Sequence, residues 1–169
     1  MNTLATFIGI LGVILYISSY QFKNRKTIVA MYTLADVMYV LQYILLGAYT
    51  GMAMDFLGLI SSFLAGKKNT PFMQKHYKSV IVALDLSMVV VGLLLFQNFF
   101  SLFAIVAVIV ETSALWCTDE KIIRRLTLIG CPLWLTYNLA FAAFGSAIGN
   151  IINFVSLIIA IYRYEKLKK

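Results

Sequence analysis

The chain has 169 residues, of which 62% are hydrophobic and 12% are charged, and its formal net charge is +7. A soluble domain carries roughly 25% charged residues, so this composition predicts an integral membrane protein. A helix needs about 20 residues to cross a bilayer, so the spans use nearly the whole chain. That leaves little room for a soluble catalytic or nucleic-acid-binding domain, and we expect no nucleic-acid partner.

Apolar runs along the chain predict an all-α protein with seven transmembrane helices. The first run has no basic segment before it and no small-residue cleavage site after it, so we expect a retained helix rather than a signal peptide. The predicted spans are residues 4–21, 28–46, 52–66, 79–96, 99–116, 126–144 and 146–162.

The basic residues predict how these helices are oriented. All 14 Lys and Arg residues follow spans 1, 3, 5 and 7, and the N-terminus and the other connections carry none. Cytoplasmic loops are enriched in Lys and Arg, so this pattern predicts an N-terminus outside, a C-terminus in the cytoplasm and an odd number of spans. We expect residues Gly66 to Lys78, which contain the single histidine His76, to form a cytoplasmic loop.

Two segments, Tyr39 to Asp55 and Tyr137 to Asn153, share a tyrosine, a G-x-x-x-G turn and a polar residue at one offset of 98 (137−39 and 153−55). Such a recurrence predicts one structural unit used twice. A three-helix unit that starts outside the membrane ends on the inside. One more helix must therefore bring the chain back outside, so that a second copy can start there and run parallel to the first. We therefore expect a first three-helix repeat in residues 1–66, a cytoplasmic linker and linker helix in 67–98, and a second repeat with a basic tail in 99–169.

Four of the seven acidic residues fall within predicted spans. An acid at the centre of a membrane helix costs roughly 2.5 to 3.5 kcal/mol, and no Lys or Arg lies in the spans to pair with it. We expect these acids to face an interior, where they are protonated, solvated or neutralised by an external cation. Asp36 and Glu111 lie deepest, and a structural role is the favoured interpretation for Asp85. The four acids are Asp36, Asp55, Asp85 and Glu111.

Helical spacing adds aromatic and amide side chains to this interior. Tyr39 shares a helix face with Asp36, and the residues matched at the offset of 98 should face each other across a pseudo-twofold axis. Close helix packing is the alternative interpretation for the small and aromatic members of these faces. The predicted substrate-binding residues are Asp36, Tyr39, Asp55, Glu111, Trp134, Tyr137, Asn138, Asn150 and Asn153.

Motifs for metal binding or catalysis do not occur in the sequence. Cys117 and Cys131 are far apart and form no C-x-x-C pair, and the sequence contains neither H-E-x-x-H nor G-x-S-x-G. We therefore expect no cofactor, no metal site and no enzymatic activity.

The arrangement of three, one and three helices resembles that of the SWEET sugar transporters and the PnuC vitamin transporters. Those families place an aromatic residue on the second helix and a polar residue on the third helix of each repeat, as Tyr39 with Asp55 and Tyr137 with Asn153 do here. Locally, the segments 19–25, 39–48, 132–138 and 145–146 resemble small bacterial inner-membrane proteins of the YgjV type. This resemblance implies a multi-pass protein of the bacterial inner membrane.

Together these observations predict a small-solute transporter that works by alternating access between two pseudo-symmetric three-helix bundles. The unpaired acids favour a polar or cationic solute over an anion, and they make proton linkage an option. The alternative is a non-transporting membrane sensor, or an assembly or lipid-interacting protein. The oligomeric state, the solute and the coupling ion stay open at this point.

Overall fold

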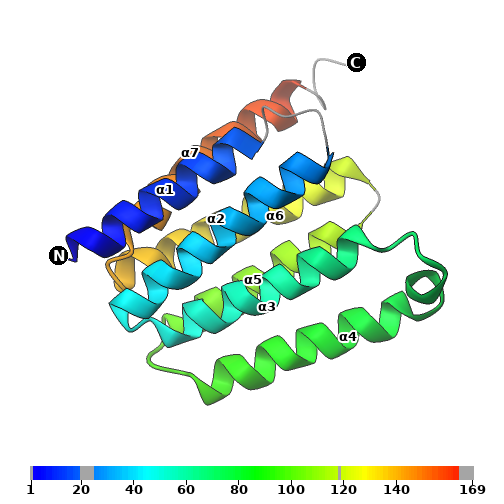
Figure 1. Ribbon diagram of the computed structural model, residues 1–169, viewed down its shortest axis with the longest axis horizontal. Helices are drawn as coiled ribbons and strands as arrows, with labels where there is room; N and C mark the ends of the chain where they lie inside the picture. The colour runs from blue at the N-terminus through cyan, green and yellow to red at the C-terminus, as the bar shows by residue number, and fades with distance from the viewer. Residues whose placement is uncertain (1, 20–24, 118, 164–169) are drawn as a thin grey trace.

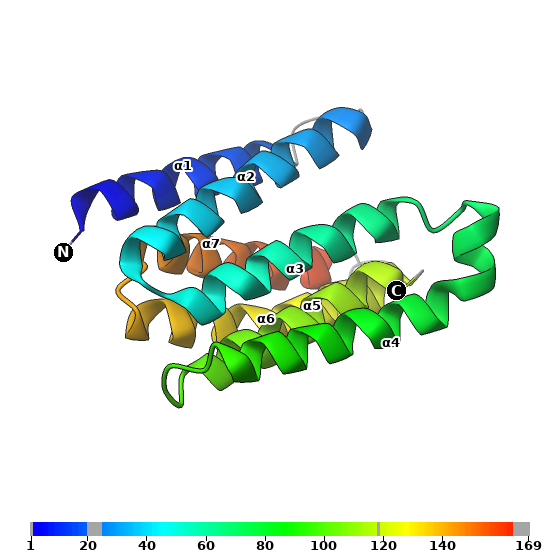
Figure 2. The ribbon, with the colours of Figure 1, turned by 60° about the horizontal axis from the view of Figure 1, so that its bottom comes forward.

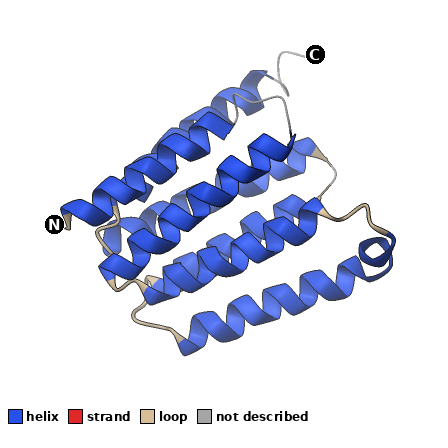
Figure 3. Cartoon of the chain, in the orientation of Figure 1, coloured by secondary structure: helices blue, strands red, loops and turns tan. Residues whose placement is uncertain are grey.

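The computed structural model describes residues 2–19, 25–117 and 119–163. Within these residues the protein is all-helical, with seven helices and no strands (Figure 3). The predicted all-α class and the number of helices are therefore confirmed. The helices are α1 (Thr3–Ser19), α2 (Arg25–Leu46), α3 (Tyr49–Gly66), α4 (Pro71–Leu94), α5 (Ser101–Trp116), α6 (Glu120–Ala140) and α7 (Phe144–Ile161).

Two helices begin well before their apolar runs, by eight residues for α4 (79−71) and six for α6 (126−120). Helix α4 begins at Pro71, because proline is preset for the first helical position, where no N–H acceptor is needed. The prediction of a loop up to Lys78 is therefore wrong from Pro71 onward, and His76 is an exposed residue of α4. Helix α6 begins after Asp119, whose side chain accepts a hydrogen bond from the Lys121 backbone N–H at 2.8 Å.

Large apolar side chains cover the outside of the bundle, while its interior combines an apolar core with several buried polar side chains. Phe7, Phe63 and Leu94 are more than half exposed, whereas Gln42 and Asn138 are almost completely buried. By length and composition, α4 and α7 could cross a membrane, and α1, Thr33–Leu46 of α2 and α5 are apolar but shorter. The large apolar exterior suits a bundle whose outer surface faces lipid.

Six helices form a closed ring, and α4 lies outside it. Around the ring, α1 packs on α2, α2 on α3, α3 on α5, α5 on α6, α6 on α7, and α7 again on α1. Helix α4 packs against α3 and α5 (Figures 1 and 2). In Figure 1, α1, α2 and α3 form a front layer and α7, α6 and α5 a back layer. The ring therefore encloses a space between these layers.

Successive helices run in opposite directions. Helices α1, α3, α5 and α7 run one way and α2, α4 and α6 return, so the start of α1 and the end of α7 lie at opposite ends of the bundle (Figure 1). The turns that join α2 to α3 and α6 to α7 consequently lie at the same end.

These two turns have the same backbone geometry. Gly47 and Ala142 have φ of 65° and 54°, and the Ala residues that follow them have φ, ψ of −86°, 65° and −80°, 60°. The Ala48 N–H donates to Tyr43 O at 2.9 Å, and the Ala143 N–H donates to Asn138 O at 2.8 Å. Each of these residues in the second turn follows its equivalent in the first turn by 95 positions in the sequence (142−47 and 138−43).

The starts of two of the three helix pairs have the same offset. Helix α7 begins and ends 95 residues after α3 (144−49 and 161−66), and α6 begins 95 residues after α2 (120−25). The predicted offset of 98 therefore differs by three residues from the offset of α2 with α6 and of α3 with α7, whereas α5 does begin 98 residues after α1 (101−3). Three residues are nearly one turn of a helix with 3.6 residues per turn. The predicted pairing therefore chose residues on about the correct face of each helix, but nearly one turn away from the correct position along the helix axis. The equivalent of Asp55 is Asn150 rather than Asn153, and the equivalent of Tyr39 is Trp134 rather than Tyr137.

Candidate functional site: a polar cavity between the two layers

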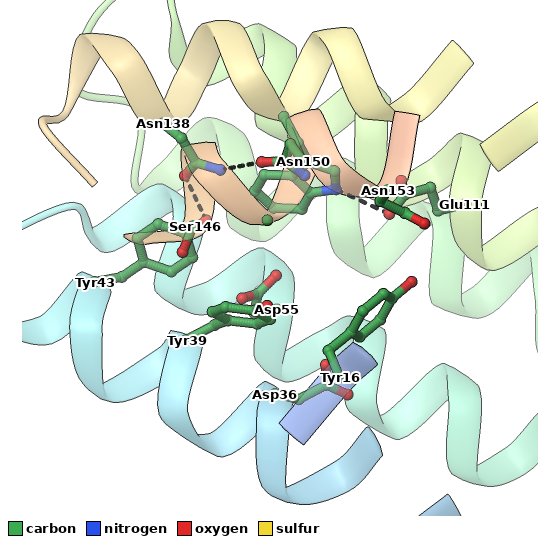
Figure 4. A pocket seen from close by; sticks show the side chains of 12 residues that line it. Tyr16, Asp36, Tyr39, Tyr43, Asp55, Glu111, Asn138, Ser146, Asn150 and Asn153 are labelled. Carbon is green, nitrogen blue, oxygen red and sulfur yellow. Dashed lines mark hydrogen bonds between the residues drawn. The ribbon is translucent and has the colours of Figure 1, made fainter. Parts of the chain in front are cut away.

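A cavity of about 90 Å³ lies between the two layers (Figure 4). A single buried water needs roughly 10 to 15 Å³, so the cavity has room for several waters or one small solute. All six ring helices contribute to its lining, and no described residue of α4 does. The lining residues are Tyr16, Asp36, Tyr39, Tyr43, Asp55, Glu111, Trp134, Asn138, Ser146, Gly149, Asn150 and Asn153.

Eight of the nine predicted binding residues line this cavity, and Tyr137 is the exception. Four lining residues were missed, namely Tyr16, Tyr43, Ser146 and Gly149. Tyr43 follows Tyr39 by four residues on the same helix face, which is a signal that the sequence contains. No spacing rule connects Tyr16 with the other members, because it comes from α1 and meets them only in the folded ring.

Three carboxylates from three helices face one space. Asp36 of α2, Asp55 of α3 and Glu111 of α5 line the first cavity and also a second one of about 90 Å³. The second cavity extends past Ser62 and Leu115 toward the ends of α3 and α5. No described Lys or Arg lines either cavity. The site therefore concentrates acidic groups where the described side chains supply no cation.

The carboxylates differ in their surroundings. Glu111 accepts a hydrogen bond from Trp134 Nε1 at 3.0 Å. Among the side chains that the structure describes, Asp36 and Asp55 have no hydrogen-bond or ion-pair partner. Asp85 lies on α4 and lines neither of the two cavities, and its structural role stays a prediction.

Amide side chains form a chain of hydrogen bonds across the other part of the cavity. Tyr43 Oη donates to Asn138 Oδ1 at 2.7 Å, and Asn138 Nδ2 donates to Asn150 Oδ1 at 2.7 Å (Figure 4). This chain connects α2 with α6 and α7. Asn153, one turn further along α7, donates from Nδ2 to Cys131 Sγ at 3.5 Å. The amides therefore hold one another in place while lining the space.

Aromatic rings complete the lining. Tyr16, Tyr39, Tyr43 and Trp134 all reach the cavity. The rings of Tyr43 and Trp134 are stacked with their centroids 6.4 Å apart. Such rings present a negative face, which attracts cations as well as apolar groups.

Two equivalent contacts link the two layers near the turns, at the end of the cavity where Ser146 lies. Tyr137 Oη accepts the Gly51 N–H at 2.7 Å, and the Gln42 amide oxygen accepts a hydrogen bond from the Ser146 hydroxyl. The contacts join equivalent positions, because Tyr137 follows Gln42 by 95 residues and Ser146 follows Gly51 by 95 (137−42 and 146−51). Tyr137 is completely buried, so it supports this seal rather than the cavity wall. We call these two contacts the double seal.

The cavity lining itself consists largely of equivalent positions. Lining residues pair at the offset of 95 in four cases (111−16, 134−39, 138−43 and 150−55). The cavity therefore lies where the two halves of the ring face each other, and each half contributes the same four positions with different side chains. The pairs are Tyr16 with Glu111, Tyr39 with Trp134, Tyr43 with Asn138, and Asp55 with Asn150.

The acids do not converge on one point. Among the described residues, no group of three or more His, Cys, Asp or Glu is placed so that it could hold a metal ion. The three carboxylates are thus spread along the cavity wall rather than gathered as ligands of one ion.

Seven helices with an apolar exterior and a polar internal cavity define the class of the chain as a helical, multi-pass membrane protein. The chain belongs to the Imp-YgjV family of bacterial inner membrane proteins, whose profile matches residues 3–168. This match confirms the YgjV-type resemblance and the location in the bacterial inner membrane. No curated protein matches the chain, and no solved structure matches it.

Proposed function

We propose that the protein is a small-solute transporter that works by alternating access between two pseudo-symmetric bundles, α1–α3 and α5–α7, with α4 as the linker helix. The observation that carries this proposal is the polar cavity whose lining residues pair at an offset of 95. Transporters built from parallel repeats bind their solutes near the membrane midplane, at the interface between the repeats. A cavity made of equivalent positions fits that location.

The proposed orientation has the N-terminus outside and the C-terminus in the cytoplasm. The Lys and Arg residues follow α1, α3, α5 and α7, which all end at one end of the bundle (Figure 1). The positive-inside rule assigns that end to the cytoplasm. The double seal then closes the cavity toward the outside, and the second cavity extends toward the cytoplasm.

Alternating access requires the double seal to open while the cytoplasmic ends of the same helices close. Each half of the ring contributes one acceptor side chain to the seal, Gln42 from α2 and Tyr137 from α6. Rocking one bundle against the other would break both contacts together, as in other two-state interfaces. Three carboxylates disfavour an anionic solute by repulsion and provide groups that can carry protons, so a polar or cationic solute with proton linkage follows.

Cysteine accessibility tests this proposal without knowledge of the solute. In a Cys117→Ser/Cys131→Ser background, Ser146→Cys places a thiol in the cavity beside the double seal, and Ser62→Cys places one in the second cavity. We expect a membrane-impermeant thiol reagent to modify Ser146→Cys from the outside in whole cells and from the cytoplasm in inverted vesicles. Ser62→Cys should react from the cytoplasmic side only.

A matched control is Ser156→Cys, because Ser156 lies on the exposed face of the same helix, α7, and should react from neither side. Reaction of Ser146→Cys from a single side under all conditions would contradict alternating access. That result would favour a non-transporting sensor, or an assembly or lipid-interacting protein.

A further inference from the structure

We infer that the solute is a small organic ammonium ion that also carries a hydrogen-bonding group such as a hydroxyl. This inference rests on the proposed function, and it assigns the ammonium group to Asp36 and Asp55 under the rings of Tyr39 and Trp134. The amides Asn138 and Asn150 receive the other end of the molecule. Charge, ring placement, polarity and size each support this assignment.

The charge of the site favours a cation. Asp36 and Asp55 have no partner among the described side chains, and no described basic residue lines either cavity. Figure 4 shows Asp36, Asp55 and Glu111 approaching one space from α2, α3 and α5. Unpaired carboxylates in a membrane interior are costly, so the protein gains from a ligand that brings the missing positive charge.

The aromatic lining favours an organic cation over a hydrated metal ion. Tyr16 and Trp134 line both cavities together with the three carboxylates, and Tyr39 lines the first cavity beside them. Aromatic faces bind alkylammonium groups by cation–π attraction and offer them apolar contact. Metal ions prefer several convergent oxygen ligands, and the described His, Cys, Asp and Glu residues contain no such group.

The carboxylates and the amides line different parts of the cavity. Asp36, Asp55 and Glu111 line both cavities, whereas Asn138, Asn150 and Ser146 line only the first, beside the double seal. A ligand in the first cavity therefore meets carboxylates at one end and amide groups at the other. An ammonium group joined by a short linker to a hydroxyl or carbonyl oxygen matches this distribution.

Size limits the ligand further. An engineered cavity of about 150 Å³ holds benzene, so a cavity of about 90 Å³ accepts a ligand no larger than that in this conformation. Sites for drug-sized molecules occupy roughly 300 to 1,000 Å³. Short aminoalcohols and alkylammonium ions are within this size, so the first cavity favours ligands of that kind.

The test is a binding titration on the full-length protein in detergent, monitored by tryptophan fluorescence, because Trp134 lies in the cavity wall. The probes are ethanolamine, choline and tetramethylammonium, with 3,3-dimethylbutan-1-ol as the uncharged shape analogue of choline. Sodium and potassium chloride serve as inorganic cations at equal ionic strength. We expect at least one ammonium probe to bind at least about tenfold more tightly than the uncharged analogue and the inorganic cations.

Two substitutions locate the ammonium group. Asp36→Asn and Asp55→Asn should each weaken ammonium binding about tenfold or more, because a neutral amide cannot balance the charge. The matched control is Asp85→Asn, an acid-to-amide change on α4 outside the ring, which should bind like the parent protein. The uncharged analogue tests the charge requirement on the unmodified protein, so the result does not depend on how the variants fold.

The outcomes separate this inference from the proposed function. Equal binding of choline and its uncharged analogue, or no binding of any ammonium probe, overturns the ammonium inference and leaves two-sided accessibility of Ser146→Cys as the evidence for transport. Ammonium binding that is lost in Asp55→Asn, combined with one-sided accessibility of Ser146→Cys, supports the site and overturns transport. Binding that survives both Asp36→Asn and Asp55→Asn overturns the assignment of the charge.

Discussion

The two halves of the ring have nearly the same backbone at the end where the double seal lies, but they form its two contacts with different side chains. In one contact a phenol, Tyr137, accepts from the N–H of Gly51, and in the equivalent contact an amide, Gln42, accepts from Ser146. The Gln42 Nε2 group finds no partner among the described residues, whereas the Tyr137 hydroxyl also lies 3.4 Å from Ala48 O. Backbone geometry is thus retained between the halves while the side chains diverge.

The packing between the halves diverges in the same way. At Gly145, an added Cβ would lie 2.8 Å from the backbone of Gly9, so α1 and α7 approach very closely. The equivalent position on α3 is Thr50 (145−50 is 95), whose hydroxyl donates to Leu95 O at 2.5 Å and pairs with Ser101 at 3.1 Å. One edge of the ring is therefore closed by glycine packing and the other by hydroxyl contacts.

The largest expected effect comes from the glycine edge. Gly145→Ala should lower the free energy of unfolding by about 3 kcal/mol, because backbone atoms of Gly9 cannot move away like the end of a flexible side chain. Unfolding by SDS titration of the purified protein measures this loss. Gly66→Ala is the control, because an added Cβ there meets nothing within 4 Å, and it should change stability by less than about 1 kcal/mol. Equal effects at the two glycines would contradict the close approach of α1 and α7.

The double seal provides the next comparison. Tyr137→Phe should cost about 2 kcal/mol, because it leaves the buried N–H of Gly51 without its acceptor. Gln42→Met should cost less than about 1 kcal/mol, since Gln42 already has an unpartnered N–H and Ser146 can bond to its own helix backbone. The same SDS titration compares the two variants. A larger cost for Gln42→Met would mean that the amide contact dominates the seal.

A charge swap between equivalent positions compares the two cavity walls. Asp55→Asn should lower ammonium affinity about tenfold, which corresponds to about 1.4 kcal/mol, and Asp55→Asn/Asn150→Asp should recover most of it. Recovery is expected because a carboxylate at position 150 can still accept the hydrogen bond from Asn138 Nδ2. Tryptophan fluorescence titration with the tightest ammonium probe measures both variants. A double variant as weak as Asp55→Asn would show that the two walls are not interchangeable.

The two turns provide the smallest and most symmetrical test. Gly47→Ala should destabilise the protein by about 1 kcal/mol, because its φ of 65° lies in the left-handed region. Ala142→Gly should stabilise it by a similar amount, since Ala142 has the same kind of conformation with φ of 54°. Thermal unfolding followed by circular dichroism can resolve both shifts. Changes of the same sign at the two positions would contradict the equivalence of the turns.

Much of the site could be predicted because its signals are local. Apolar runs predict helices, and an acid such as Asp36 inside such a run must face inward because lipid disfavours it. Helical spacing then adds Tyr39, which lies three residues further along the same face. Tyr137 shows the limit of this reasoning, because the same spacing placed it in the site, whereas its ring is buried beside the cavity and its hydroxyl supports the seal.

The sequence by itself determined the membrane class, the number of helices and the helix faces that carry polar groups, because these depend on composition and on periods within one helix. The tertiary structure decided the offset of 95 between the halves, the place of Tyr16 in the cavity wall and the exclusion of α4 from the ring. These properties depend on which residues of neighbouring helices lie at the same position along the bundle axis. A shift of three residues leaves the face of a helix almost unchanged and moves every contact by nearly one turn, so only packing between helices can select the level.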